Sequence, residues 1–96
     1  MDYCEIEEKK YQLELENLND SLLRLEFEFD LTENARVRDI KRLNSQILES
    51  YDDEYLEYLN DEIKRSEFDG PLLKRAYLRE VEYLNISIAE LEANNM

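Results

Sequence analysis

The sequence predicts an all-α protein of three long amphipathic helices, arranged as an antiparallel, coiled-coil-like bundle that forms a dimer. Two features predict this class. Leu, Glu, Asn, Tyr, Lys and Arg are abundant among the 96 residues, and the only strong helix breakers are one glycine and one proline. Apolar residues also recur at intervals of three and four along most of the chain. At this length we expect a single helical domain over residues 1–96.

The first predicted helix spans about residues 3–31, and its apolar positions advance by four and three residues in turn, as in a coiled-coil seam. This seam is expected to make helix-helix or dimer contacts and comprises Tyr11, Leu15, Leu18, Leu22, Leu25 and Phe29. A second apolar stripe on roughly the opposite side comprises Leu13, Leu23, Phe27 and Leu31. A helix that is apolar on two sides needs two neighbours, which favours self-association.

Residues 23–31 also have a second interpretation, because apolar and charged residues alternate strictly along them, as in a half-buried strand. A β-hairpin would pair residues 11–15 with 23–31 across a turn at 16–20. Residues 7–31 contain no Val, Ile or Thr, whereas Leu and Glu are strong helix formers. The composition favours the helix and leaves the hairpin as the alternative.

The second predicted helix spans about residues 33–68. Asp30 and Glu33 have the spacing of a capping box, which suits a helix start here. Apolar residues then stay in phase over 37–59, which favours one continuous helix. A serine followed by an aspartate three residues later could start a separate helix, so a kink near residues 50–53 remains open.

The third predicted helix spans about residues 71–93. It begins at the clearest boundary signal of the chain, where Gly70 suits a helix end and Pro71 suits the first turn of the next helix. Three helices joined by tight turns should pack antiparallel. The middle helix would be roughly 50 Å long at ~1.5 Å per residue, which predicts a rod that buries little and therefore dimerises.

The sequence offers few groups for catalysis. Histidine is absent, which removes the commonest general base and the commonest metal ligand. Cys4 is the only cysteine, and its acidic neighbours disfavour a reactive thiolate. No glycine-rich phosphate loop occurs, and the EF-hand pattern fails at its first and twelfth positions. We therefore expect a protein that is not an enzyme, with no catalytic residues, no metal site and no cofactor.

The charge pattern restricts the partners. The net charge is −13, which opposes direct binding to nucleic acid or to an anionic membrane and favours a basic protein surface. Residues 34–50 are the only basic segment, and we expect them to pair with the acidic first helix. This basic cluster comprises Arg36, Arg38, Lys41 and Arg42. We expect a cytoplasmic protein, because the first ten residues carry acids where a signal peptide would carry bases and no apolar run reaches membrane-spanning length. A single cysteine forms no internal disulfide, which is compatible with a reducing compartment.

Dense acidic stretches suggest the functional hypothesis. Along one helix face, carboxylates every four residues recur every ~6 Å, against one phosphate per ~3.4 Å along a DNA strand. The candidate partner-binding acids are Glu26, Glu28, Asp30, Asp52, Asp53, Glu54, Glu57, Asp61 and Glu62. They suggest an inhibitor that mimics nucleic acid and occupies the basic groove of a DNA- or RNA-binding protein, as small phage-encoded inhibitors of host defence nucleases do. The alternative is a coiled-coil adaptor or oligomerisation subunit that binds partners through apolar stripes.

Overall fold

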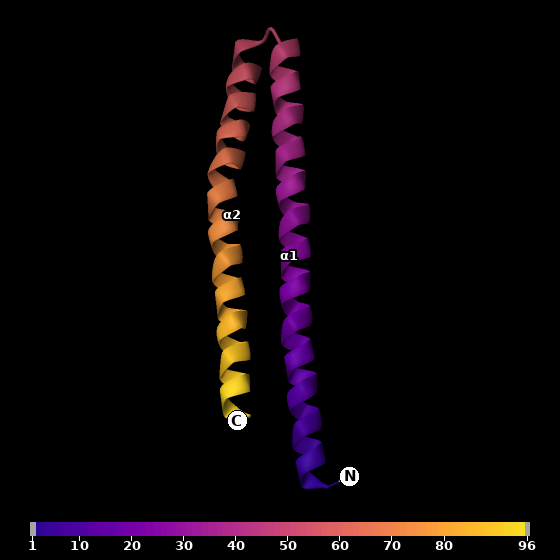
Figure 1. The fold of residues 1–96 in the computed structure, drawn as a ribbon. Helices are drawn as coiled ribbons and strands as arrows, with labels where there is room; N and C mark the ends of the chain where they lie inside the picture. Colours follow the sequence, from indigo (N-terminus) through magenta and orange to yellow (C-terminus); the bar gives the residue numbers. More distant parts are fainter. Residues whose placement is uncertain (1, 96) are drawn as a thin grey trace. The chain divides into compact units, whose positions relative to one another are not determined.

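The computed structural model describes residues 2–95 and contains two helices rather than three. Helix α1 spans Tyr3–Glu49, and helix α2 spans Asp53–Asn94. Residues 50–52 connect them (Figure 1). The described residues contain no strand, so the predicted all-α class is confirmed. The predicted three-helix bundle is wrong, and the β-hairpin alternative fails because residues 11–31 lie inside α1.

The contacts of the chain divide it into two compact units, and each helix contributes a segment to both. Unit 1 comprises the described residues up to Phe27 together with those from Tyr77 onward. Unit 2 comprises Glu28–Ala76 and includes the connection between the helices. Each unit is described below by itself. The expectation of a single domain stays a prediction.

The break between α1 and α2 arises from local hydrogen bonds at residues 50–52. The backbone N–H of Asp52 donates to Oγ of Ser50 at 3.3 Å, which diverts the chain from helical bonding. Oδ1 of Asp52 then accepts the backbone N–H groups of Glu54 at 3.0 Å and Tyr55 at 3.4 Å. Asp52 is therefore the N-cap of α2. The sequence left a kink open near residues 50–53. In the structure the helix ends there and a second helix begins, which is the only interruption between residues 3 and 94.

The predicted boundary near residue 32 does not exist, because α1 continues through it. No glycine or proline interrupts this region. Glu33 was expected to serve a helix cap, but its carboxylate instead binds the guanidinium of Arg36 one turn later. Nε of Arg36 donates to one carboxylate oxygen at 3.3 Å, and Nη2 donates to the other. This two-point pairing supports a continuous helix.

The predicted boundary at Gly70 and Pro71 is also wrong, because both residues lie inside α2. No described glycine has a positive φ, so Gly70 does not form the left-handed cap that would end a helix. Pro71 removes one helical hydrogen bond. A residue before proline usually avoids the helical region because its Cβ contacts the proline ring, and Gly70 has no Cβ. The glycine thus lowers the cost of the proline that follows it.

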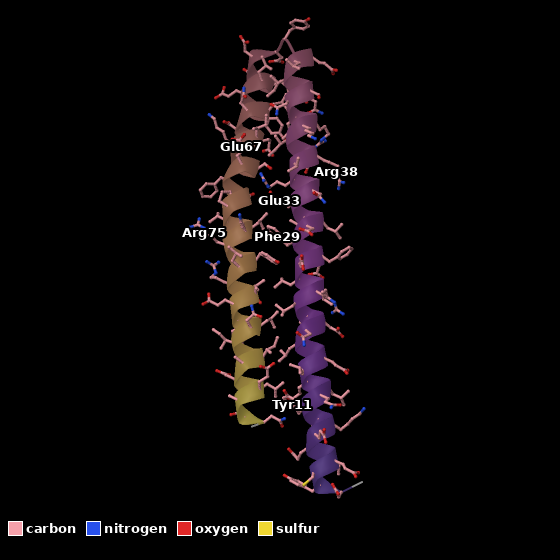
Figure 2. All side chains as sticks on the ribbon, in the orientation of Figure 1. Tyr11, Phe29, Glu33, Arg38, Glu67 and Arg75 are labelled. Atoms are coloured by element: carbon pink, nitrogen blue, oxygen red, sulfur yellow. The ribbon has the colours of Figure 1, made fainter. Side chains whose placement is uncertain are left out.

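Unit 1 is held together by two facing apolar stripes that are half-buried. The stripe of α1 comprises Tyr11, Leu15, Leu18, Leu22 and Leu25, and that of α2 comprises Tyr77, Val81, Leu84, Ile88 and Leu91. Tyr11 lies on the side of α1 that faces α2 (Figure 2). Tyr11 and Leu91 line one surface hollow, and Leu22 and Val81 line another, so the two segments run antiparallel within this unit.

Unit 2 is a helical hairpin with a mixed apolar and charged seam. Leu59 is the only large apolar side chain that is fully buried among residues 2–95, with 1 % of its surface exposed. The seam of α1 continues the four-three spacing from Phe29 through Glu33 and Arg36. Figure 2 shows Phe29 and Glu33 on the side of α1 that faces α2, and Arg38 on the opposite side. Charged groups therefore interrupt the apolar contact in this unit.

Neither helix contains, within residues 2–95, a stretch that is long and apolar enough to cross a membrane.

Candidate functional site

The predicted acidic positions do not form one continuous surface. Glu26 belongs to unit 1, whereas the other eight belong to unit 2. Because residues 26–30 are helical, alternate positions point about 200° apart. Glu28 therefore lies on the side of α1 opposite to Glu26 and Asp30. These three acids cannot act as one column of charge.

Three acids on α2 do share a face and are referred to as the acidic row: Asp53, Glu57 and Asp61. They are four residues apart, so their carboxylates follow each other at ~6 Å along the helix axis. All three side chains are exposed, and none makes an ion pair with another described residue. Glu54 is exposed beside them. The acidic row is the part of unit 2 best suited to meet a cationic partner.

Two of the predicted acids already have structural partners. Asp52 caps α2, and its Oδ1 is used by two backbone N–H groups. Glu62 accepts a hydrogen bond from Nη1 of Arg65 at 3.0 Å and is half-buried. Binding a partner through these carboxylates would compete with these contacts, which makes them weaker candidates than the acidic row.

Two tyrosines accompany the acidic row. The rings of Tyr55 and Tyr58 are stacked, with centroids 6.2 Å apart and planes 18° from parallel. Both rings are exposed, and both line an open groove of about 320 Å³ in unit 2. Leu43 and Leu59 form its apolar part, and Arg42 and Glu62 are among its charged residues. This arrangement joins apolar contact area to hydrogen-bonding hydroxyl groups next to the carboxylates.

The central feature of unit 2 is a charged contact between its helices, which we term the Arg36 clasp and define by Glu33, Arg36, Ser66 and Gly70. Besides its two bonds to Glu33, Arg36 donates from Nη1 to the backbone carbonyl of Ser66 on α2 at 3.2 Å. Ser66 lies one turn before Gly70, where the missing side chain leaves room for the guanidinium. The clasp therefore links α1 to α2 at a defined register.

The electrostatics of the clasp follow from these contacts. The hydrogen bond from Arg36 lowers the pKa of Glu33 below its ordinary value, and burial partly opposes this shift. The same bond raises the pKa of Arg36, with further support from the negative charges of Glu67 and Asp69. Lys74 also favours the ionised form of Glu33. The pair is therefore ionised at neutral pH.

The basic cluster pairs locally in the structure. Arg36 pairs with Glu33, and Arg42 approaches Asp39 at 3.7 Å, both within α1. Arg38 and Lys41 are exposed and make no ion pair with any residue that the structure describes. The two unpaired cations remain available to an external anionic surface.

Unit 1 carries an open groove of about 400 Å³ between its two helical segments, which we term the unit 1 groove. Its lining residues are Asn19, Leu22, Leu23, Glu26, Tyr77, Val81 and Asn85. Four of them are apolar or aromatic, and Glu26 is the only charged one. Leu23 has 66 % of its surface exposed, so its apolar side chain is largely uncovered.

Many other large apolar side chains are exposed on both units. In unit 1 they include Tyr3, Leu13, Phe27, Leu78, Tyr83 and Ile86. In unit 2 they include Leu31, Val37, Leu48, Tyr51, Phe68, Leu72 and Leu73. Two of the exposed side chains, Leu23 and Phe27, are four residues apart on α1, and Phe68 and Leu72 are four apart on α2. Such neighbouring exposed pairs are typical of helices that contact another chain.

Sequence reasoning missed the Arg36 clasp because it interpreted Gly70 and Pro71 as a boundary. One signal was present: the four-three spacing of the first seam continues from Phe29 to residues 33 and 36, which are charged. A charged pair at seam positions needs a partner on the facing helix and space to accommodate it. A glycine far along the chain can provide that space.

No group of three or more Cys, Asp or Glu side chains that could hold a metal ion occurs within residues 2–95. Cys4 is an exposed free thiol. The geometry thus provides binding surfaces and a structural ion pair. In comparisons with protein-family models, curated proteins and solved structures, none matches this chain.

Proposed function

We propose that this chain is a non-enzymatic helical interaction protein, an adaptor or oligomerisation subunit that binds protein chains through apolar side chains exposed on both units. One observation carries the proposal. Only Leu59 is fully buried among the large apolar side chains of residues 2–95, while many others are exposed. Monomeric proteins rarely expose contiguous apolar patches without a binding role. A cytoplasmic location belongs to the same proposal.

The experiment uses paired substitutions of exposed apolar residues. Leu23→Ser with Phe27→Ser alters unit 1, and Phe68→Ser with Leu72→Ser alters unit 2. These side chains are exposed, so helix content by circular dichroism should not change. We expect at least one pair to lower partner recovery from source-cell extract by about tenfold or more, measured by quantitative mass spectrometry. Unchanged recovery with both pairs would contradict the proposal.

A second candidate function is inhibition by nucleic-acid mimicry, and one observation favours it. The carboxylates of the acidic row are exposed, regularly spaced and free of ion pairs within the described chain. A single row has about half the charge density of a DNA strand. Glu54 and the neighbouring tyrosine hydroxyl groups would add to the contact with a basic groove.

Charge reversal separates the two candidates. Substituting Asp53, Glu57 and Asp61 by lysine should abolish binding by a mimic and should change binding by an apolar adaptor little. A mimic should also compete with DNA or RNA for its target, and its affinity should fall as salt rises. A matched control reverses three exposed acids that are not among the candidates, Glu80, Glu82 and Glu90. If the acidic-row variant recovers its partners as well as the control does, mimicry is wrong.

A further inference from the structure

The unit 1 groove and one exposed face of α1 in unit 2 have opposite charge and matching apolar content. That face, which we term the basic ridge, comprises Val37, Arg38, Lys41 and Leu48. We propose that the unit 1 groove binds the basic ridge of a second copy of this chain. The inference rests on the proposed function and specifies its partner.

The unit 1 groove has the form expected of a site for a helix. Residues 19, 22, 23 and 26 line it from α1, and residues 77, 81 and 85 line it from α2. Each row extends over about two helical turns, or roughly 12 Å. Apolar side chains lie between polar ones, with Asn19 and Asn85 as hydrogen-bonding groups. A helix lying along such a groove would bury Leu23 and meet Glu26 with a cation.

The charge of unit 1 selects a basic occupant. Its segments contain 12 acidic and 4 basic residues, which gives a net charge of −8. Glu26 is the one charged residue lining the groove and makes no ion pair with another described residue. An acidic helix would be repelled, while a helix with lysine or arginine beside its apolar residues would be attracted.

The basic ridge is such a helix face within the same chain. Val37, Lys41 and Leu48 follow at intervals of four and seven residues, which places them on one side of α1. Leu48 has 86 % of its surface exposed. Lys41 and Arg38 are exposed beside it and unpaired within the described chain. Arg38 lies on the side of α1 away from α2 (Figure 2).

The net charge of −13 per chain does not prevent this contact. At physiological salt, charges on separate molecules are largely screened beyond about 8 Å. The interaction between the groove and the ridge is set at shorter range by Glu26, Arg38, Lys41 and the apolar residues between them. Each copy offers both surfaces, so every chain can contribute a groove to one contact and a ridge to another.

A charge-swap experiment tests the inference at 150 mM salt, a concentration that screens the net charges. Sedimentation equilibrium over a concentration series should show association of the wild-type chain. Glu26→Lys alters the groove, and Arg38→Glu with Lys41→Glu alters the ridge. Each variant alone places like charges at the contact, so we expect self-association to weaken by at least about tenfold. Glu28→Lys, an exposed reversal outside both surfaces, is the matched control and should associate like wild type.

Mixing the two variants provides the decisive measurement. The lysine at position 26 of one variant then meets the new glutamates of the other, and the second contact has its original charges. Association of the mixture should return to within about threefold of the wild-type dissociation constant. A dye on Cys4, the only cysteine and an exposed one, allows this to be followed by fluorescence anisotropy.

Three outcomes would overturn the inference: a wild-type chain that stays monomeric up to about 1 mM, association that survives both reversals, or a mixture that does not recover. A monomeric chain whose partner recovery still depends on Leu23 and Phe27 would overturn self-association and leave the proposed function standing. A monomeric wild-type chain whose partner recovery is unchanged by both pairs of apolar substitutions would overturn both the inference and the proposed function. Recovery of the mixture supports the inference.

Discussion

Gly70 of α2 and Arg36 of α1 fit together because the glycine has no side chain. A Cβ atom at position 70 would lie 2.8 Å from Cζ of Arg36 and 3.0 Å from each of its Nη atoms. The guanidinium occupies this space while it donates to Glu33 and to the carbonyl of Ser66. The facing helix therefore requires a glycine here, although no positive φ does.

This fit predicts an effect of Gly70→Ala whose size depends on Arg36. Alanine favours a helix interior by about 1 kcal/mol over glycine, and the contact of its Cβ with the ring of Pro71 offsets that gain in every background. In the wild type the new methyl group must also displace the guanidinium, whose hydrogen bonds contribute about 2 kcal/mol. We expect Gly70→Ala to lower the free energy of unfolding by about 2 kcal/mol more in the wild type than in an Arg36→Ala background.

This double-mutant cycle is measured by urea unfolding, monitored by circular dichroism, with all variants at the same protein concentration. Arg38→Ala is the matched control, because Arg38 lies on the side of α1 away from α2 (Figure 2). In the Arg38→Ala background Arg36 is intact, so Gly70→Ala should change the free energy of unfolding by the same amount as in the wild type. Equal effects of Gly70→Ala in the three backgrounds would show that the two residues do not interact.

The clasp also predicts a dependence of stability on pH. The pKa of Glu33 is lowered in the folded chain, chiefly by its hydrogen bond with Arg36, so its ionised form stabilises folding. That contribution is fully present above the ordinary carboxyl pKa of about 4.3. It is lost as the pH falls through the lowered pKa of the folded state. Wild type and Glu33→Gln should therefore differ by about 1 kcal/mol at pH 7 and converge in acid.

Glu62→Gln is the control for this experiment. Glu62 pairs with Arg65 at the same three-residue spacing, but the Arg65 side chain is 70 % exposed, whereas Arg36 is only 20 % exposed. An exposed pair of this kind contributes a few tenths of a kcal/mol. A Glu33→Gln effect that is as small as the Glu62→Gln effect, or that does not shrink in acid, would contradict the role given to the clasp.

The spacing of apolar residues predicted the helical class, and individual breaker residues misplaced the boundaries. Gly70 and Pro71 suggested a helix end, but the deciding group was Arg36, more than thirty residues away in sequence. The true break at residues 50–52 depends on competition between local side-chain bonds and helical ones, which spacing alone does not rank. The acidic row could be predicted because its members are four residues apart. Glu26 and Glu28 would share one side of a strand, but they lie on different sides of a helix, so their placement depended on which of the two forms.

The connection between the helices gives a third prediction. Asp52 caps α2 through two backbone N–H groups, so Asp52→Ala should lower the free energy of unfolding by about 1 kcal/mol. Asp53→Ala is the control, because Asp53 lies in the first turn without a capping bond and acts only through the helix dipole. Its removal should cost a few tenths of a kcal/mol. Thermal unfolding would contradict the cap if the two variants lost equal stability.

Leu59 provides the last prediction, because it is the most deeply buried apolar side chain that the structure describes in unit 2. It is the one fully buried large side chain in the described part of the chain. Leu59→Ala should lower the free energy of unfolding by about 3 kcal/mol, through lost apolar burial and the cavity left behind. Leu48→Ala makes the same chemical change at an exposed position and should alter stability by less than about 0.5 kcal/mol. Both values come from urea unfolding at a concentration where each variant is monomeric, so that no second copy covers Leu48. Similar losses for the two variants would contradict the role given to Leu59.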